Sequence, residues 1–172
     1  PENVGIGKYT GEFADFLNEK KHQIKVICAP KYYPNWEASL NKYYVENKST
    51  YPIFRCPIYV PKYPNGLKRL IHLFTFSVTS LPVLLKQLYW KPDAIIVITP
   101  TILCAFNVII FSLFSYKKLL TLLHIQDFEL DAAFNLGILK GNIYKMFFSK
   151  IELFLYNKFT VVSCISKNMI NL

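Results

Sequence analysis

Acidic residues are missing from a long central stretch of this chain. No position between Glu46 and Asp93 is Asp or Glu, whereas the same stretch carries seven Lys and Arg residues. The whole chain of 172 residues has a formal net charge of +9. Such a surplus indicates an anionic partner, such as nucleic acid, a phosphorylated substrate or an anionic membrane face. The basic residues form no Lys/Arg-rich run, so we expect no nucleic-acid partner.

Several familiar signatures are also missing. The four cysteines are far apart and form no C-x-x-C pair, so we expect neither a zinc site nor a disulfide framework. A Gly-Lys-Ser phosphate loop, a recognisable Ser-His-Asp arrangement and a signal peptide are absent as well. The chain begins at Pro1 without an initiator Met and stops at Leu172 inside a helix-like pattern. We therefore expect both ends to be cut.

One uncharged run is long enough to cross a bilayer. No charged residue occurs from Ala94 to Tyr116. However, Thr99-Pro100-Thr101 interrupts the run, and the β-branched residues before it suit a strand. We therefore expect a buried parallel strand followed by a core helix, in preference to a membrane span.

Helical and extended patterns alternate along the whole chain. The expected helices cover residues 5–20, 67–88, 102–116 and 143–156, and the expected strands cover 23–29, 51–60, 93–99, 119–125 and 159–165. Residues 30–50 are expected to form a long loop, and Pro82 is expected to kink or divide its helix. The alternation predicts an α/β, Rossmann-like domain with a mainly parallel sheet and helices on both faces.

Ligands of such sheets bind at the carboxyl ends of the strands. His124 and Asp127 come at the end of the strand expected over residues 119–125. A His and a carboxylate at that place could position or polarise a sugar hydroxyl, so we take both as candidate catalytic residues. The alternative is a His that satisfies loop carbonyls.

Glycines open the first expected helix. Gly5-x-Gly7 is a weak phosphate-binding signal, because glycine lets a ligand approach the backbone and a helix N-terminus favours negative charge. A nicotinamide-binding domain would need Asp or Glu at the end of the next strand. That strand ends Cys28-Ala29-Pro30-Lys31, which argues against NAD, and a simple tight turn is the other interpretation.

Three carboxylates lie close together at Asp127, Glu129 and Asp131. Their oxygens could bind magnesium or manganese. Alternating acidic and apolar residues are more typical of one solvated face of an amphipathic turn, so we expect no metal.

The segment from Lys62 to Lys91 combines basic residues with Leu and Phe. This composition is typical of an element at a membrane surface, and it also fits a core helix with solvated lysines. For the first alternative, the candidate membrane-surface residues are Lys62, Lys68, Arg69 and Lys86. His72 lies in the same segment and is expected to be a surface or interfacial residue.

Six blocks of the sequence resemble one family. They are residues 1–12, 29–36, 55–57, 64–69, 124–133 and 162–169. The most specific block is His124-Ile-Gln-Asp-Phe-Glu-Leu-Asp-Ala-Ala133. Together they resemble the N-terminal domain of family 4 glycosyltransferases with the two-domain GT-B fold, most closely the colanic acid and related exopolysaccharide transferases. The resemblance covers residues 1–172 as one acceptor-side domain.

The resemblance implies what the whole enzyme would do. It implies a metal-independent, retaining transfer from a nucleotide-diphosphate sugar to a lipid-diphosphate-linked saccharide, without a cofactor. The enzyme would be cytoplasmic and peripheral on the inner face of the cytoplasmic membrane. The donor-binding C-terminal domain and the first strand, expected before Pro1, are absent from this sequence. The isolated chain is therefore expected to be inactive.

The resemblance also implies roles for single residues. Gly5 and Gly7 would line the cleft beside the diphosphate, His124 would lie near the transferred sugar, and Asp127 would serve the acceptor. The candidate substrate-binding residues are Gly5, Gly7, Lys8, Tyr33, Trp36, Glu129 and Ser166. Two other classes stay open, namely a dinucleotide-dependent oxidoreductase domain and a non-catalytic membrane-associated scaffold.

Overall fold

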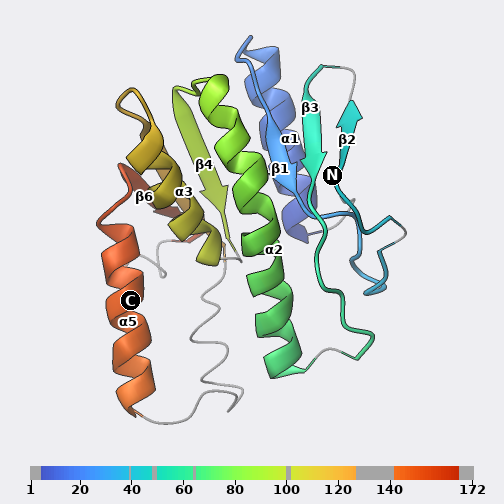
Figure 1. Cartoon of the computed structure of the whole chain (residues 1–172), viewed down its shortest axis with the longest axis vertical. Helices are drawn as coiled ribbons and strands as arrows, with labels where there is room; N and C mark the ends of the chain where they lie inside the picture. Colours follow the sequence, from blue (N-terminus) through green and yellow to red (C-terminus); the bar gives the residue numbers. More distant parts are fainter. Residues whose placement is uncertain are drawn as a thin grey trace. The chain divides into compact units, whose positions relative to one another are not determined.

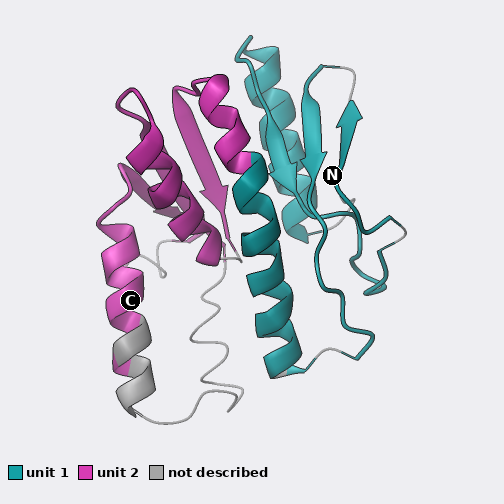
Figure 2. Ribbon diagram, viewed as in Figure 1, with its two compact units in different colours: residues 1–83 teal, residues 84–172 magenta. Residues whose placement is uncertain are grey.

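The computed structural model describes residues 5–38, 40–47, 50–63, 65–99, 102–126 and 142–166. The chain divides into two compact units, unit 1 with residues 1–83 and unit 2 with residues 84–172 (Figure 2). Each unit contains one three-stranded sheet and helices (Figure 1).

Unit 1 is built from α1 (Gly5–Glu19), β1 (Val26–Cys28), β2 (Tyr44–Asn47), β3 (Pro52–Arg55) and most of α2 (Gly66–Lys86). Its strand order is β1-β3-β2, with β1 parallel and β2 antiparallel to β3. Ala14 of α1 packs with Tyr51 and Ile53 in a small core, because the small side chain lets the helix approach the sheet.

Unit 2 contains η1 (Gln87–Tyr89), β4 (Ala94–Ile98), α3 (Leu103–Phe114), β5 (Leu120–Ile125), α5 (Asn142–Tyr156) and β6 (Val161–Cys164). The strand order is β4-β5-β6, and all pairs are parallel. The β-branched and leucine-rich strand sequences suit a buried parallel sheet. Its core consists of apolar side chains from β4, α3, β5 and α5 with the loop after α5, namely Val97, Ala105, Val108, Leu123, Ile125, Leu155 and Phe159.

The predicted α/β class and the mainly parallel pairing are confirmed. The run from Ala94 to Tyr116 is the predicted strand and helix, because β4 and α3 occupy it. Within residues 30–50, predicted as a loop, Tyr44–Asn47 form a strand that is fixed by pairing with β3. Pro82 does not divide its helix, since α2 runs on to Lys86.

Candidate functional site

The carboxyl ends of β4, β5 and β6 lie side by side in unit 2. His124 pairs in register with Ile98 on one side and with Ser163 on the other. Thr99 follows β4 directly. Neighbouring parallel strands bring their ends to one edge of the sheet, so these residues meet although they are far apart in sequence. His124 thus lies at the strand end predicted for it.

The imidazole of His124 contacts a hydroxyl from the next strand. Its Nδ1 lies 2.9 Å from Ser163 Oγ. The hydrogen bond orients the ring through Nδ1 and leaves Nε2 as the ring nitrogen for a ligand. His124 is half-buried, so the ring keeps some access to solvent. A half-buried imidazole held by one nitrogen can position a hydroxyl or move its proton.

Thr99 fixes the backbone at this edge. Its N–H donates to the carbonyl of His124 over 3.0 Å, and its Oγ1 accepts from the N–H of Gln126 over 3.2 Å. Thr99 is 1% exposed. Sequence reasoning pointed to the carboxyl ends of the strands but singled out neither Thr99 nor Ser163 as a candidate. Small hydroxyl side chains at strand ends were the only available signal, and they occur too widely in proteins to be decisive.

A further candidate, Ser166, lies just after β6 and is exposed. Asp127 and Glu129 lie outside the described residues, and so does Asp131. Among the residues that are described, no three His, Cys, Asp or Glu side chains come together in a way that could hold a metal ion.

The loop after β1 forms an aromatic cluster in unit 1. Trp36 lies 5.8 Å from the Tyr32 ring and 5.5 Å from His72, measured between ring centroids. The guanidinium of Arg69 lies over the same indole at 5.8 Å. Trp36 has a positive φ of 53°, an uncommon backbone conformation for a bulky residue. The candidate Tyr33 is 50% exposed, whereas Trp36 is half-buried in this packing.

His72 is buried, and the prediction that it lies at the surface is wrong. It is 3% exposed, and its Nδ1 donates to the carbonyl of Tyr59 over 2.5 Å. Burial lowers the pKa of His72 below its ordinary value, since the neutral ring is favoured away from water. Sequence reasoning missed the burial of His72, because hydrophobic periodicity predicts that a helix buries its apolar residues, whereas α2 buries polar ones.

Arg55 fixes the start of the loop after β1. Its Nη1 donates to the carbonyl of Ala29 over 2.7 Å, while Nε and Nη2 donate to Glu46 Oε2 over 3.1 and 2.9 Å. Hydrogen bonding from Arg55 lowers the pKa of Glu46. Arg55 is 3% exposed and connects the ends of β1 and β3 with β2. Sequence reasoning gave Arg55 no role of its own, since a single Arg in a strand carries no pattern.

The glycine candidates belong to α1. Gly5 is its first residue and has φ +60°, whereas Gly7 lies within the helix. A Cβ at Gly5 would meet no atom within 4 Å, so glycine serves the backbone conformation there. Lys8 forms an exposed ion pair with Glu12 at 3.9 Å. Gly5, Gly7, Lys8, Tyr33 and Trp36 belong to unit 1, whereas His124 and Ser166 belong to unit 2.

The residues predicted for a membrane surface lie on or before α2. Lys62, Arg69 and Lys86 are exposed and Lys68 is half-buried. Arg69 lies against Trp36, so the structure joins one of these residues to the aromatic cluster.

Sequence comparison identifies a relative. The chain is 41% identical over 99% of its length to WcaI of Escherichia coli (strain K12), a protein named as a colanic acid biosynthesis glycosyl transferase. This similarity confirms the resemblance to the colanic acid transferases of glycosyltransferase family 4. It spans 43% of the length of WcaI. No protein-family model matches the chain, and no solved structure matches it.

Proposed function

We propose that this chain is the acceptor-side part of a glycosyltransferase of exopolysaccharide biosynthesis. The reaction would transfer a sugar from a nucleotide-diphosphate donor to a lipid-diphosphate-linked saccharide, with retention at the anomeric carbon. The observation that carries the proposal is the pair of His124 and Ser163 at the carboxyl edge of a parallel sheet, in a chain similar to WcaI over almost its whole length.

The proposed chemistry needs a positioned hydroxyl and a stabilised leaving group. The bond from the anomeric carbon to the diphosphate breaks, a bond to the acceptor oxygen forms, and the acceptor proton leaves with the diphosphate. In this scheme Nε2 of His124 contacts a hydroxyl of the transferred sugar, and Ser163 keeps the ring in that orientation. Asp127 would serve the acceptor hydroxyl. Losing a contact made in the transition state costs about 10²-fold in rate.

Binding of the donor is assigned to the part of the enzyme outside this chain. Transfer needs donor and acceptor held together at bonding distance, which contributes much of the rate. Since the chain spans 43% of WcaI, we expect the 172-residue chain alone to show no turnover.

The test is sugar transfer by the full-length protein, with radiolabelled nucleotide sugars and a membrane extract as the source of acceptor. We expect His124→Ala to lower kcat about 10²-fold without changing the fold. The matched control is His22→Ala, because His22 is exposed and lies between α1 and β1. Near-normal turnover of His124→Ala, or transfer by the 172-residue chain alone, would contradict the proposal.

A further inference from the structure

Gln126 follows β5 directly and lies on the same side of the chain as His124. Along β5 the side chains alternate between buried and more exposed positions, and Leu123 and Ile125 are 0 and 3% exposed. His124 and Gln126 are both half-buried and continue this alternation. Side chains two residues apart project from one face of an extended chain. The imidazole and the carboxamide therefore share one face at the carboxyl edge of the sheet.

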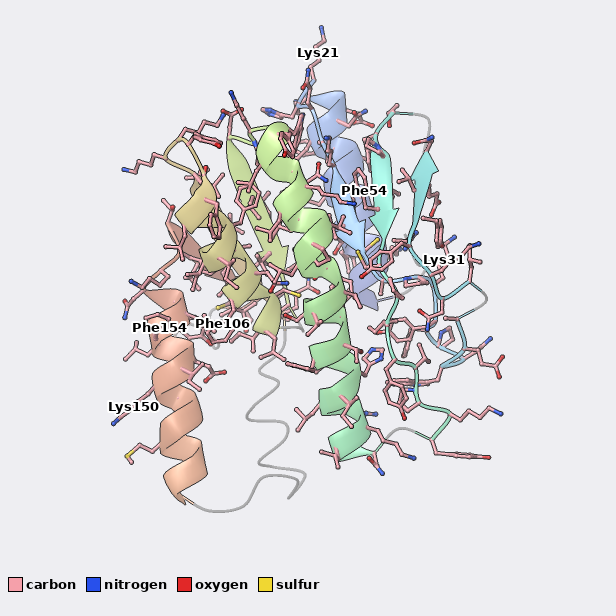
Figure 3. All side chains as sticks on the ribbon, viewed as in Figure 1. Lys21, Lys31, Phe54, Phe106, Lys150 and Phe154 are labelled. Carbon is pink, nitrogen blue, oxygen red and sulfur yellow. The ribbon has the colours of Figure 1, made fainter. Side chains whose placement is uncertain are left out.

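Apolar side chains close the opposite face of β5. Leu123 and Ile125 belong to the core of unit 2 together with residues of α3. Phe106 of that helix, which is labelled in Figure 3, packs against the same core. A ligand at this edge would therefore meet the polar face of β5, on which Gln126 lies.

The carboxamide of Gln126 has no hydrogen-bond partner in the part of the chain that the structure describes. Its backbone N–H, in contrast, donates to Thr99 Oγ1 over 3.2 Å. A carboxamide has two N–H donors and a carbonyl acceptor, and a half-buried one needs partners from a ligand or from water. Nε2 of His124, which the contact with Ser163 leaves for a ligand, belongs to the same face. Two polar groups are thus available together.

Thr99 fixes the backbone that carries this carboxamide. Its N–H donates to the carbonyl of His124 over 3.0 Å, which continues the parallel ladder between β4 and β5. The next bond of such a ladder would run from the N–H of Gln126 to the carbonyl of Thr99, but the side-chain Oγ1 accepts it instead. The hydroxyl therefore ends the ladder and sets the direction in which the chain leaves β5. Thr99 is 1% exposed, so it acts on a ligand through Gln126.

We propose that Gln126 is a further substrate-binding residue whose carboxamide binds two adjacent hydroxyls of a pyranose, and that Thr99 is its positioning residue. This inference rests on the proposed function, because it takes a sugar as the ligand of His124. One sugar hydroxyl accepts from the amide N–H and the other donates to the amide carbonyl. A sugar without one of these hydroxyls leaves the amide unpaired, so Gln126 selects among sugars.

The transferred sugar and the acceptor saccharide both carry such hydroxyls, and kinetics separate the two sources. The test uses the full-length protein with a panel of radiolabelled nucleotide sugars and a membrane extract as the source of acceptor. Gln126→Leu keeps the size of the side chain and removes its hydrogen bonds. We expect KM for one of the two substrates to rise about tenfold, with a smaller change in kcat. The substrate whose KM rises is the one that Gln126 binds.

Gln23→Leu is the matched control, because Gln23 is exposed and lies between α1 and β1. It should leave both KM values unchanged. Deoxy analogues of the substrate with the raised KM then identify the hydroxyls. Removing one of them should lower kcat/KM of the unchanged enzyme about tenfold and should lower that of Gln126→Leu no further, because both changes remove the same contact.

The positioning role of Thr99 has its own variants. Thr99→Val removes the hydroxyl at nearly the same volume and should raise the same KM as Gln126→Leu, whereas Thr99→Ser keeps the hydroxyl and should restore it. A loss of stability alone would lower the folded fraction, and with it the apparent kcat, but would leave KM unchanged. Thr99→Val combined with Gln126→Leu should have the KM of Gln126→Leu alone, because Thr99 acts through Gln126.

Unchanged KM values in Gln126→Leu would overturn the proposal, and so would an equal rise in Gln23→Leu. A raised KM in Thr99→Ser would overturn the role of the Thr99 hydroxyl. Loss of turnover in His124→Ala beside a normal Gln126→Leu would keep the proposed function and reject this inference.

A measurement without turnover separates the two proposals in the other direction. If the full-length protein transfers no sugar, the proposed function fails, and binding decides the inference by saturation-transfer NMR with free glucose, galactose and mannose. We expect the signal of at least one of these sugars to be lost in Gln126→Leu and kept in Gln23→Leu. Equal signals in the two variants would overturn the assignment of Gln126.

Discussion

Unit 1 and unit 2 each carry a three-stranded sheet, but different chemistry holds the strands in place. Among the described residues of unit 2, seven buried apolar side chains form one core. The buried apolar cluster among the described residues of unit 1 has three members, and polar side chains hold the loops. Arg55 contacts Ala29 and Glu46, Asn41 bonds both backbone groups of Ile58, and Tyr51 donates to Asp15.

The two units show two different ways of holding a loop in place. Apolar packing fixes the mean distance between elements, but it is not directional. Hydrogen bonds from buried groups fix particular atoms, and a buried group left without its partner costs about 1–3 kcal/mol. We therefore expect unit 2 to be sensitive to lost volume, and unit 1 to lost polar partners and to pH.

The largest effect is expected from a cavity in unit 2. Leu155 of α5 is 0% exposed, so Leu155→Ala should lower the free energy of unfolding by about 3 kcal/mol. Leu153→Ala on the same helix is the control, because Leu153 is 61% exposed and should change stability by less than about 0.5 kcal/mol. Urea unfolding measures both. Equal effects would mean that the apolar core does not hold unit 2.

The next effect concerns the buried guanidinium of unit 1. Arg55→Met should lower the free energy of unfolding by about 2 kcal/mol, because the carbonyl of Ala29 and the carboxylate of Glu46 lose their donor. Glu46 is 36% exposed, so water compensates part of the loss. The control is Lys117→Met, which breaks the exposed pair with Asp93 and should cause no measurable change. If Arg55→Met were as stable as the unchanged protein, buried polar contacts would not hold unit 1, and the two units would not differ in this way.

A third prediction addresses the polar pair of unit 2 in the full-length enzyme. Ser163→Ala should lower kcat about tenfold with little change in KM, because the His124 ring loses the contact at Nδ1. Ser163→Thr keeps the hydroxyl and should restore kcat. A loss in Ser163→Thr equal to that in Ser163→Ala would show that Ser163 serves packing alone.

The smallest effect is a pH dependence of unit 1. Burial lowers the pKa of His72, so the unfolded chain takes up a proton near pH 6.5 while the folded chain does not. Unfolding is therefore favoured as the pH falls below about 6.5, by at most about 1.4 kcal/mol per pH unit. Glu46 and Asp93 also have lowered pKa values, but these carboxylates affect the stability only at lower pH.

Unfolding curves between pH 7.5 and 5 measure this slope. His72→Gln should flatten it, whereas His22→Gln should keep it, because His22 is exposed. An unchanged slope in His72→Gln would assign the pH dependence to another group.

Strands and helices could be predicted from the sequence where one face of the element, or one continuous run of residues, is apolar. Leu120–Ile125, Ala94–Ile98 and Leu103–Phe114 lie where the hydrophobic runs placed them. The placement of His124 follows from this, because a residue at the end of a buried parallel strand is fixed at the carboxyl edge of the sheet. Tyr44–Asn47 was missed, since a four-residue strand carries too little pattern of its own and is defined by its partner.

By itself the sequence determined the alternation of strands and helices, the basic stretch after Glu46 and the position of His124, because these depend on periodicity and charge along the chain. Only the tertiary structure decided that Ser163 contacts His124, that Arg55 anchors the loop after β1, and that α2 turns its apolar stripe outward. Periodicity defines the faces of a helix but not which face is covered. That depends on neighbours distant in sequence, here Tyr59 and Pro57 bonded to the hydroxyls of α2.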